Sequence, residues 1–206
     1  MPLLKSINLN NRLMILVWKI NEDSTYFSDL DLSCNSLNRL DTIKSEHQKR
    51  GFLSVRKLLC IAGYCDQDLY YLENGKPCLK DKKHISISHT QKYAAIVISE
   101  APAGIDIEKC RLQLFKIKHK FLNSKEIEWS SKKISLKMLT VLWCCKEALY
   151  KLYPNKGLSL TKIRINDFEI KHRVATGSIL EENWSRSYNI NFEFIEDHVL
   201  VFATQK

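Results

Sequence analysis

The chain has 206 residues, of which 45% are hydrophobic and 27% charged, a composition typical of a folded protein and not of a disordered one. Lys and Arg number 32 against 23 Asp and Glu, so the formal net charge is +9. This excess favours an anionic partner, such as nucleic acid, a phosphorylated small molecule, an acidic protein or a membrane surface. The seven cysteines include no Cys-x-x-Cys pair, which favours a reducing cytoplasmic compartment over a disulfide framework or zinc cage.

The N-terminal stretch predicts a strand followed by a long helix. Residues 11 to 20 are read as a buried strand, because their apolar run from Leu13 to Trp18 is too short to span a bilayer. No signal peptide is expected, since the run is flanked by charges and lacks a small-residue cleavage site. Residues 37 to 63 have helical apolar spacing, and Gly63 is a plausible stop.

Turn chemistry and alternating patterns follow. In ENGKPCLKD, Gly75 and Pro77 bracket Lys76 and predict a turn. HISISHT (84–90) alternates as a strand, and YAAIVIS (93–99) follows after a short polar break, which predicts a hairpin. Pro102 and Gly104 then interrupt the chain before the next strand.

That next strand is AGIDIEKC, residues 103 to 110, and it carries two closely spaced acids. Side chains on a strand alternate between its faces, so Ile105 and Ile107 can enter a core while Asp106 and Glu108 share the other face. Two residues of strand span about 6.6 Å, and like charges at that spacing are unfavourable unless a positive group lies between them.

The C-terminal half predicts helices and then a sheet. Residues 112 to 153 are mostly helical with a break around 130 to 135, and Pro154 and Gly157 end the pattern. Four short strands follow, in IRINDFEI, VATGSIL, YNINFEF and HVLVFA. The order predicts an α+β fold of two similar halves, residues 1–101 and 102–206, with the acidic strand and a ligand site at the seam between them.

A third acid lies in the helix LWCCKEALYKLY. Leu142, Cys145, Leu149 and Leu152 form its apolar stripe, and Glu147 lies nearly opposite, one turn before Lys151. A solvated ion pair is the alternative interpretation, but Trp143 on the same face favours a covered cleft. If Glu147 faces the acidic strand, then Asp106, Glu108 and Glu147 form an all-oxygen site suited to Mg²⁺ or Mn²⁺. Such an ion in a basic protein indicates phosphate chemistry.

Other polar residues leave alternatives open. His89, beside Ser88 at a predicted strand end, can be structural or a ligand-binding residue. Arg50 and Arg56 can reach a phosphate from one helix or lie on the surface. No Walker loop, G-x-G-x-x-G or G-x-S-x-G motif occurs, which excludes those routes to nucleotide binding or acyl transfer.

Four motifs in this order resemble one family. GKP at 75–77, SISHT at 86–90, GIDIEK at 104–109 and WCCKEALYK at 143–151 look like the signature motifs of 4'-phosphopantetheinyl transferases. The length and the strand NRLMILVWKI resemble the larger surfactin-synthetase type, a monomer of two similar halves. KGLSL at 156–160 is also similar to the family pattern.

The resemblance implies a reaction and a set of partners. The family transfers the phosphopantetheine arm of coenzyme A to a serine of an apo acyl or peptidyl carrier protein, releasing adenosine 3',5'-bisphosphate. It implies Mg²⁺, with Mn²⁺ possible, coenzyme A as co-substrate, and an acidic carrier protein as partner. It implies neither nucleic acid nor a membrane as partner.

The resemblance also implies residue roles. Asp106, Glu108 and Glu147 would hold the metal against the coenzyme A pyrophosphate. Lys151 would stabilise the negative charge that develops on the leaving group. Glu126, Glu147 or a metal-bound water would take the serine proton. The implied coenzyme A residues are Lys76 and Pro77 in the groove, Ser88, His89 and Arg50 near the 3'-phosphate, and Arg39 as an additional candidate. Thr90 and Cys110 depart from the family pattern, which commonly has Ser at the first position and Thr, in some members, at the second.

Two other classes of function compete with the transferase. A Mg²⁺-dependent nuclease would also need acids beside a lysine in a basic protein, but it leaves the GKP and SHT motifs unexplained. A non-catalytic nucleic-acid-binding or protein-binding module would use the acids structurally, and it predicts neither metal affinity nor coenzyme A binding.

Overall fold

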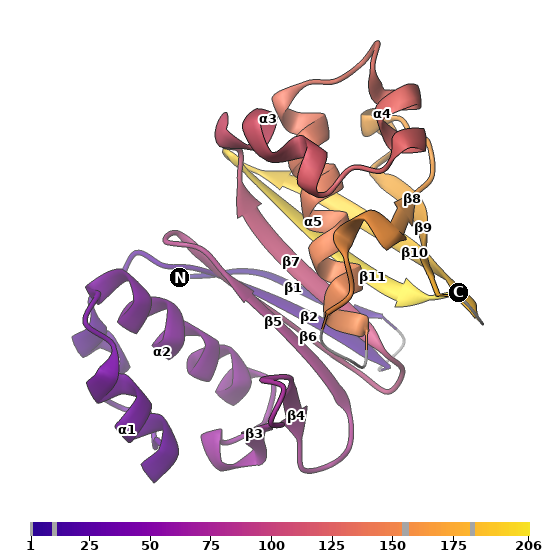
Figure 1. Ribbon diagram of the computed structural model, residues 1–206. Helices are drawn as coiled ribbons and strands as arrows, with labels where there is room; N and C mark the ends of the chain where they lie inside the picture. The colour runs from indigo at the N-terminus through magenta and orange to yellow at the C-terminus, as the bar shows by residue number, and fades with distance from the viewer. Residues whose placement is uncertain (1, 10–11, 154–156, 182–183) are drawn as a thin grey trace. The chain divides into compact units, whose positions relative to one another are not determined.

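The computed structural model describes residues 2–9, 12–153, 157–181 and 184–206. About 35% of the residues are helical and 35% lie in strands, which confirms the predicted α+β class. The chain separates into two units, Met1–Ala101 and Pro102–Lys206. We describe each unit by itself (Figure 1).

The N-terminal unit is built on a four-stranded antiparallel sheet in the order β1-β2-β6-β5. Its strands are β1 (Leu3–Leu9), β2 (Leu13–Lys19), β5 (His84–His89) and β6 (Tyr93–Ser99), and a separate small hairpin pairs β3 (Leu69–Tyr71) with β4 (Pro77–Leu79). The helical segments are η1 (Ser24–Phe27), α1 (Cys34–Thr42), α2 (Glu46–Ile61) and η2 (Asp66–Asp68). Helix α2 packs on the sheet through buried side chains such as Phe52, Leu58 and Leu59 (Figure 1).

The prediction of one continuous helix over residues 37 to 63 is wrong, because two helices lie in this region. The backbone is extended at Ile43, with φ −77° and ψ 112°, so α1 ends there and α2 begins after its own N-cap residue, Ser45. β-branched residues such as isoleucine favour extended backbone, which is consistent with a break at this point. The predicted stop is confirmed, because Gly63 follows the end of α2 with a φ of +85°, a conformation that suits glycine.

The predicted turns and hairpin of this unit are confirmed. Strands β5 and β6 pair antiparallel, with Ile87 opposite Ile96. Gly75 lies in the β3–β4 turn with a φ of +82°, and its N–H donates to the carbonyl of Leu72 at 2.7 Å. Strand β1 was not predicted, because its alternation is interrupted by polar residues at an edge position of the sheet.

The C-terminal unit has a five-stranded antiparallel sheet in the order β7-β11-β10-β9-β8. Its strands are β7 (Ala103–Lys109), β8 (Ile163–Ile165), β9 (Val174–Leu180), β10 (Ser185–Ile195) and β11 (His198–Gln205). Its helical segments are α3 (Gln113–Ile117), η3 (Lys118–Lys120), α4 (Ser124–Ser130), α5 (Leu136–Leu152), η4 (Leu160–Lys162) and η5 (Ile170–His172). The predicted strand in IRINDFEI is shorter than expected, since only its first three residues pair with β9.

Helix α5 packs on this sheet and forms the core of the unit (Figure 1). Its predicted apolar stripe is largely confirmed, because Leu142, Cys145 and Leu149 are fully buried. The predicted break is also confirmed, since α4 ends at Ser130 and α5 begins at Leu136. Ser135 caps α5 by accepting a hydrogen bond from the N–H of Met138 at 3.2 Å. Pro154, the predicted stop, lies outside the described residues.

Within the described ranges, none of the helices has both the length and the apolar character that crossing a bilayer requires.

Candidate active site

Strand β7 places its two acids on the sheet face that α5 covers. Asp106 pairs with Val201 of β11 and Glu108 with Val199, and both valines belong to the core that α5 covers. Ile105 points to the opposite face and, like Ile107, is at most 1% exposed. The predicted alternation is therefore present, and the acids lie beside the helix that carries the third predicted acid.

Two cations hold the two acids of β7. Lys151 of α5 donates from Nζ to Asp106 Oδ1 at 2.8 Å and to the carbonyl of Ile105 at 2.8 Å. Arg111, just after the strand, donates to Glu108 Oε2 at 2.6 Å. These two ion pairs offset much of the repulsion between the carboxylates in the metal-free protein.

Glu147 shares the electrostatic environment of the strand acids. Burial raises its pKa from 4.5 to about 7; the nearby Asp106 and Glu108 carboxylates also raise it, while Lys151 opposes them. Glu147 is therefore coupled by charge to both strand acids. A buried carboxyl with a pKa near neutrality is typical of functional sites.

The residues present are chemically suited to a hard cation, but they are not arranged as a preformed cage. Among the residues that the structure describes, no three His, Cys, Asp or Glu side chains are grouped as metal ligands. Asp106 and Glu108 are instead engaged by Lys151 and Arg111. Carboxylate oxygens without His or Cys suit Mg²⁺, and a divalent cation would relieve the mutual repulsion that raises the pKa of Glu147.

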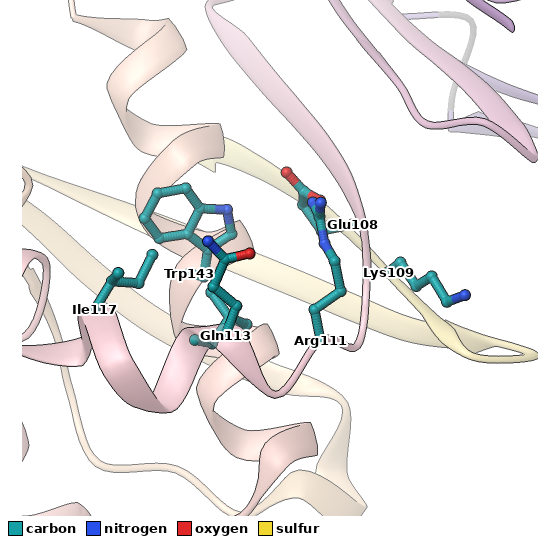
Figure 2. Close-up of a pocket in the computed structure, with 7 residues that line it drawn as sticks. Glu108, Lys109, Arg111, Gln113, Ile117 and Trp143 are labelled. Atoms are coloured by element: carbon teal, nitrogen blue, oxygen red, sulfur yellow. The ribbon is translucent and has the colours of Figure 1, made fainter.

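A pocket of about 170 Å³ opens beside Glu108 (Figure 2). Its lining residues are Glu108, Lys109, Arg111, Gln113, Leu114, Ile117 and Trp143. In Figure 2 the Arg111 and Glu108 side chains meet at one side of the pocket, Trp143 lies across from them, and Lys109 points away. The sequence pattern did not identify Gln113 as a site residue, because α3, which carries it, is too short to have a clear period. It also missed Arg111, whose spacing of three residues from Glu108 was the available signal.

Glu126 makes a buried set of contacts of its own, and its predicted catalytic role stays a prediction. Its carboxylate is completely buried and forms an ion pair with Lys146 Nζ at 2.8 Å. Its two oxygens also accept hydrogen bonds from the backbone N–H groups of Asn123 and Ile165. A general base must come within hydrogen-bond reach of the hydroxyl that it deprotonates, so this enclosure favours another group as the proton acceptor.

In the N-terminal unit, the predicted coenzyme A residue His89 packs against Gly51 of α2, which follows the predicted residue Arg50 in the chain. A β-carbon placed on Gly51 would lie 3.1 Å from His89 Nδ1, so the imidazole rests directly on the helix next to Arg50. Arg50 itself contacts His47, whose Nδ1 lies 2.7 Å from the guanidinium. His47 was not predicted; its spacing of three residues from Arg50 was the available signal.

The remaining predicted residues of this unit lie on two hairpins and α1. Lys76 and Pro77 belong to the β3–β4 hairpin, and the positive charge of Lys76 lowers the pKa of His84, secondary to burial. Ser88 lies in β5, one residue before His89. Thr90 accepts hydrogen bonds from the N–H groups of Lys92 and Tyr93, so its hydroxyl shapes the turn. The guanidinium of Arg39 lies over the Tyr71 ring, 5.5 Å from its centroid.

The fold and this carboxylate–lysine cluster define an α+β protein with a candidate phosphate-chemistry site in its C-terminal unit. Residues 102–203, which carry the whole cluster, match the family model of the 4'-phosphopantetheinyl transferase superfamily. The chain belongs to this superfamily, as its motifs predict.

Two curated relatives are similar to the chain. It is 30% identical over 139 residues to 4'-phosphopantetheinyl transferase gsp of Aneurinibacillus migulanus, covering 65% of this chain and 57% of that protein. It is 33% identical over 93 residues to 4'-phosphopantetheinyl transferase Sfp of Bacillus subtilis (strain 168), covering 43% of this chain and 41% of that protein. The matched regions thus span about half the length of these relatives.

The raised pKa of Glu147 predicts a pH-dependent stability in the absence of metal. The unfolded chain releases this proton near pH 4.5, but the folded protein holds it until about pH 7. Folding therefore binds a proton between these values, and stability falls as the pH rises through them. The wild type should lose roughly 1–3 kcal/mol of unfolding free energy over this pH range, and we expect Glu147→Gln to prevent that loss.

Urea unfolding in EDTA at pH 5 and pH 8 measures this effect as the difference between wild type and variant. At pH 8 the variant should have a higher free energy of unfolding than the wild type, and at pH 5 the two values should be similar. Mg²⁺ should narrow the gap at pH 8 by stabilising only the wild type. An unchanged difference across this range would show that Glu147 is ionised normally.

Proposed function

We propose that the protein is a 4'-phosphopantetheinyl transferase. It would transfer the 4'-phosphopantetheine arm of coenzyme A to a serine of an apo acyl or peptidyl carrier protein. The observation that carries the proposal is the cluster of Asp106, Glu108, Glu147 and Lys151 on β7 and α5, inside the region that matches the superfamily model. We further propose that the units Met1–Ala101 and Pro102–Lys206 are the two halves of this enzyme.

The proposed chemistry is a phosphoryl transfer with balanced bonds. The serine oxygen would attack the phosphorus that carries the pantetheine arm, and the bond from that phosphorus to the bridging oxygen would break. The leaving group is adenosine 3',5'-bisphosphate. The serine proton must be removed in the same step, so the site needs both a proton acceptor and positive charge near the pyrophosphate.

Residues of the C-terminal unit supply these needs. Asp106, Glu108 and Glu147 would hold Mg²⁺, which when bound polarises the pyrophosphate oxygens and stabilises the charge of the leaving group. Lys151, which forms an ion pair with Asp106 in this structure, would place a second positive charge beside the pyrophosphate. Since Glu126 is enclosed in the core, Glu147 is the remaining side-chain candidate for the proton acceptor.

Residues of the N-terminal unit would recognise coenzyme A. Arg50 and His89, which adjoin Gly51 on α2, are assigned to the ribose 3'-phosphate, with Ser88 nearby. Lys76 and Pro77 are assigned to the groove for the rest of the molecule. The support for these roles is the resemblance of the GKP and SHT motifs, together with the packing of His89 against Gly51, the residue after Arg50.

Intact-protein mass spectrometry tests the proposed function directly. Several apo carrier proteins are incubated with the protein, coenzyme A and Mg²⁺, and a mass gain of one phosphopantetheine arm on the carrier is the expected result. The matched control is a carrier whose acceptor serine is alanine. If no carrier gains mass while the protein degrades DNA with Mg²⁺, the site is that of a nuclease.

The 3'-phosphate assignment predicts a selective loss of affinity. Arg50→Ala and His89→Ala should weaken coenzyme A binding much more than binding of 3'-dephospho-coenzyme A. A hydrogen bond to a charged group contributes about 1.5–3 kcal/mol, so we expect a loss of roughly 10- to 100-fold for coenzyme A alone. Calorimetric titration with both ligands measures the difference, and Lys49→Ala on the same helix is the control. Equal losses for both ligands would remove the assignment.

The basic charge predicts salt-dependent encounter with an acidic carrier. The candidate docking residues are Lys116 in α3 and Lys118 and Lys120 in η3. Leu112, which immediately precedes α3 in the sequence, is 72% exposed. Physiological salt screens charges beyond about 8 Å, so the Michaelis constant for the carrier should rise steeply with salt while the maximal rate changes little.

Charge reversal at Lys116 and Lys120 should flatten that salt dependence. Lys171→Glu, an exposed lysine on a different element, is the control and should keep it. Steady-state kinetics at several ionic strengths provide the measurement. A Michaelis constant that does not respond to salt in the wild type would indicate mainly apolar docking.

A further inference from the structure

The buried ion pair between Glu126 and Lys146 connects three elements of the C-terminal unit. Both side chains have no exposed surface, and Lys146 Nζ lies 2.8 Å from Glu126 Oε2. Glu126 belongs to α4, Lys146 belongs to α5, and the N–H of Ile165 in β8 donates to Glu126 Oε1 at 2.8 Å. A charged pair so completely removed from water needs a full set of partners to be tolerated.

That set of partners is complete. An ammonium group has three donors, and those of Lys146 go to Glu126 and to the carbonyls of Leu160 at 2.9 Å and Ile163 at 2.6 Å. Glu126 accepts from the N–H of Asn123 at 2.9 Å as well, closing a capping box at the start of α4. All three protons of Lys146 and both oxygens of Glu126 are thus engaged by other residues of the unit, which indicates a geometric contribution.

The geometric consequence falls on the next residue of α5. Successive residues of an α-helix are about 100° apart around its axis, so the direction of Lys146 determines the direction of Glu147. A rotation of α5 by about 20° would move a side-chain end about 5.5 Å from the axis by roughly 2 Å. Displacements of about 1 Å can cost 100-fold in rate, so this rotation must be held closely.

We propose that Glu126 and Lys146 are positioning residues that set the rotation of α5 and so aim Glu147 and Lys151 at Asp106 on β7. The inference rests on the proposed function for its catalytic meaning. It assigns to Glu126 a role through other residues in place of proton transfer. It predicts that turnover follows the geometry of the site and not the presence of the Glu126 carboxylate.

Three variants test the positioning role: Glu126→Gln, Lys146→Met and the double variant. Each single change leaves one buried charge without its counter-ion, whereas the double variant removes both charges and keeps similar volumes. Three quantities are measured on each full-length protein. They are the backbone amide chemical shifts of Asp106 and Lys151 without metal, the affinity for Mn²⁺, and the rate of phosphopantetheine transfer. Glu128→Gln, an exposed change on the same helix, is the control.

We expect each single variant to shift the two amide signals and to lower the affinity for Mn²⁺ at least about tenfold. Turnover should fall in parallel. The double variant restores the charge balance but not the ion pair that fixes α5, so its amide signals should stay shifted, and its Mn²⁺ affinity and turnover should stay below wild type even if its stability recovers. A purely stabilising role would lower the melting temperature without changing shifts or affinity in the folded protein. Should the singles fail to fold, the double variant alone decides.

The proposal is overturned if any folded variant keeps wild-type amide shifts and Mn²⁺ affinity but loses turnover, because Glu126 or Lys146 would then take part in the chemistry. It is also overturned if the shifts stay unchanged in both single variants. Absence of Mn²⁺ binding by the wild type would contradict the proposed metal site, but the metal-free amide shifts would still decide the positioning role.

Discussion

Glu108→Ala and Glu147→Ala are each expected to abolish phosphopantetheine transfer while leaving the fold largely intact. Both acids are proposed metal ligands, so their loss removes the cation that stabilises the leaving group, and we expect turnover to fall at least about 1000-fold. The fold should tolerate the changes because the carboxylates repel one another. The raised pKa of Glu147 shows that its ionised form is unfavourable where it lies.

Transfer assays at saturating Mg²⁺, paired with circular dichroism and thermal unfolding, measure both parts of this prediction. Glu128→Ala is the matched control, since Glu128 is an exposed glutamate on α4 and should keep normal turnover. Near-normal turnover of either site variant at high Mg²⁺ would contradict the three-carboxylate site. A variant that loses its secondary structure would instead show that the acid is needed for folding.

The second large effect is expected at Gly104, where β7 passes close beneath α5. A β-carbon at this position would lie 2.1 Å from the carbonyl oxygen of Ala148 and 3.2 Å from the Leu152 side chain. The first of these contacts is with helix backbone, which cannot move without displacing α5 from the sheet. We expect Gly104→Ala to destabilise the protein by at least about 3 kcal/mol, beyond the range of ordinary overpacking.

Gly104→Ala should also reduce transfer, because Glu147 and Lys151 are carried by the displaced helix. Gly51→Ala is a useful comparison for stability. Its added β-carbon meets only the His89 side chain, at 3.1 Å, and a side chain can move aside. Urea unfolding of both variants gives the two free energies of unfolding. A Gly104→Ala protein as stable as the wild type would show that α5 can be lifted from β7 at little cost.

Several features follow from local sequence, because neighbouring residues determine them. Alternation in GIDIEK is enough to separate Asp106 and Glu108 from Ile105 and Ile107, since a strand has a period of two. The 3-4 spacing of Leu142, Cys145 and Leu149 likewise specifies which side of α5 is buried. Glycines at turns and helix ends mark where elements stop. These patterns allowed the α+β class and most elements to be predicted.

Order of motifs along the chain carried information that no single motif did. GKP, SISHT, GIDIEK and WCCKEALYK are each short, but their succession identified the superfamily that the comparison of residues 102–203 supports. The same patterns relate Glu147 to Trp143 and Lys151, each one helical turn away, which favoured a covered cleft over a solvated ion pair. Whether Glu147 faces the strand acids stayed conditional at that level.

Only the tertiary structure decided the partners of individual charges. Glu126 could be a free base or a core residue from sequence alone; its enclosure by Lys146 and by the N–H of Ile165 involves residues 20 and 39 positions away along the chain. The pocket beside Glu108 likewise depends on how α3 packs near α5. The pKa of Glu147 depends on burial and on charges from another element. Desolvation and Coulomb interactions act through space, so no local pattern encodes them.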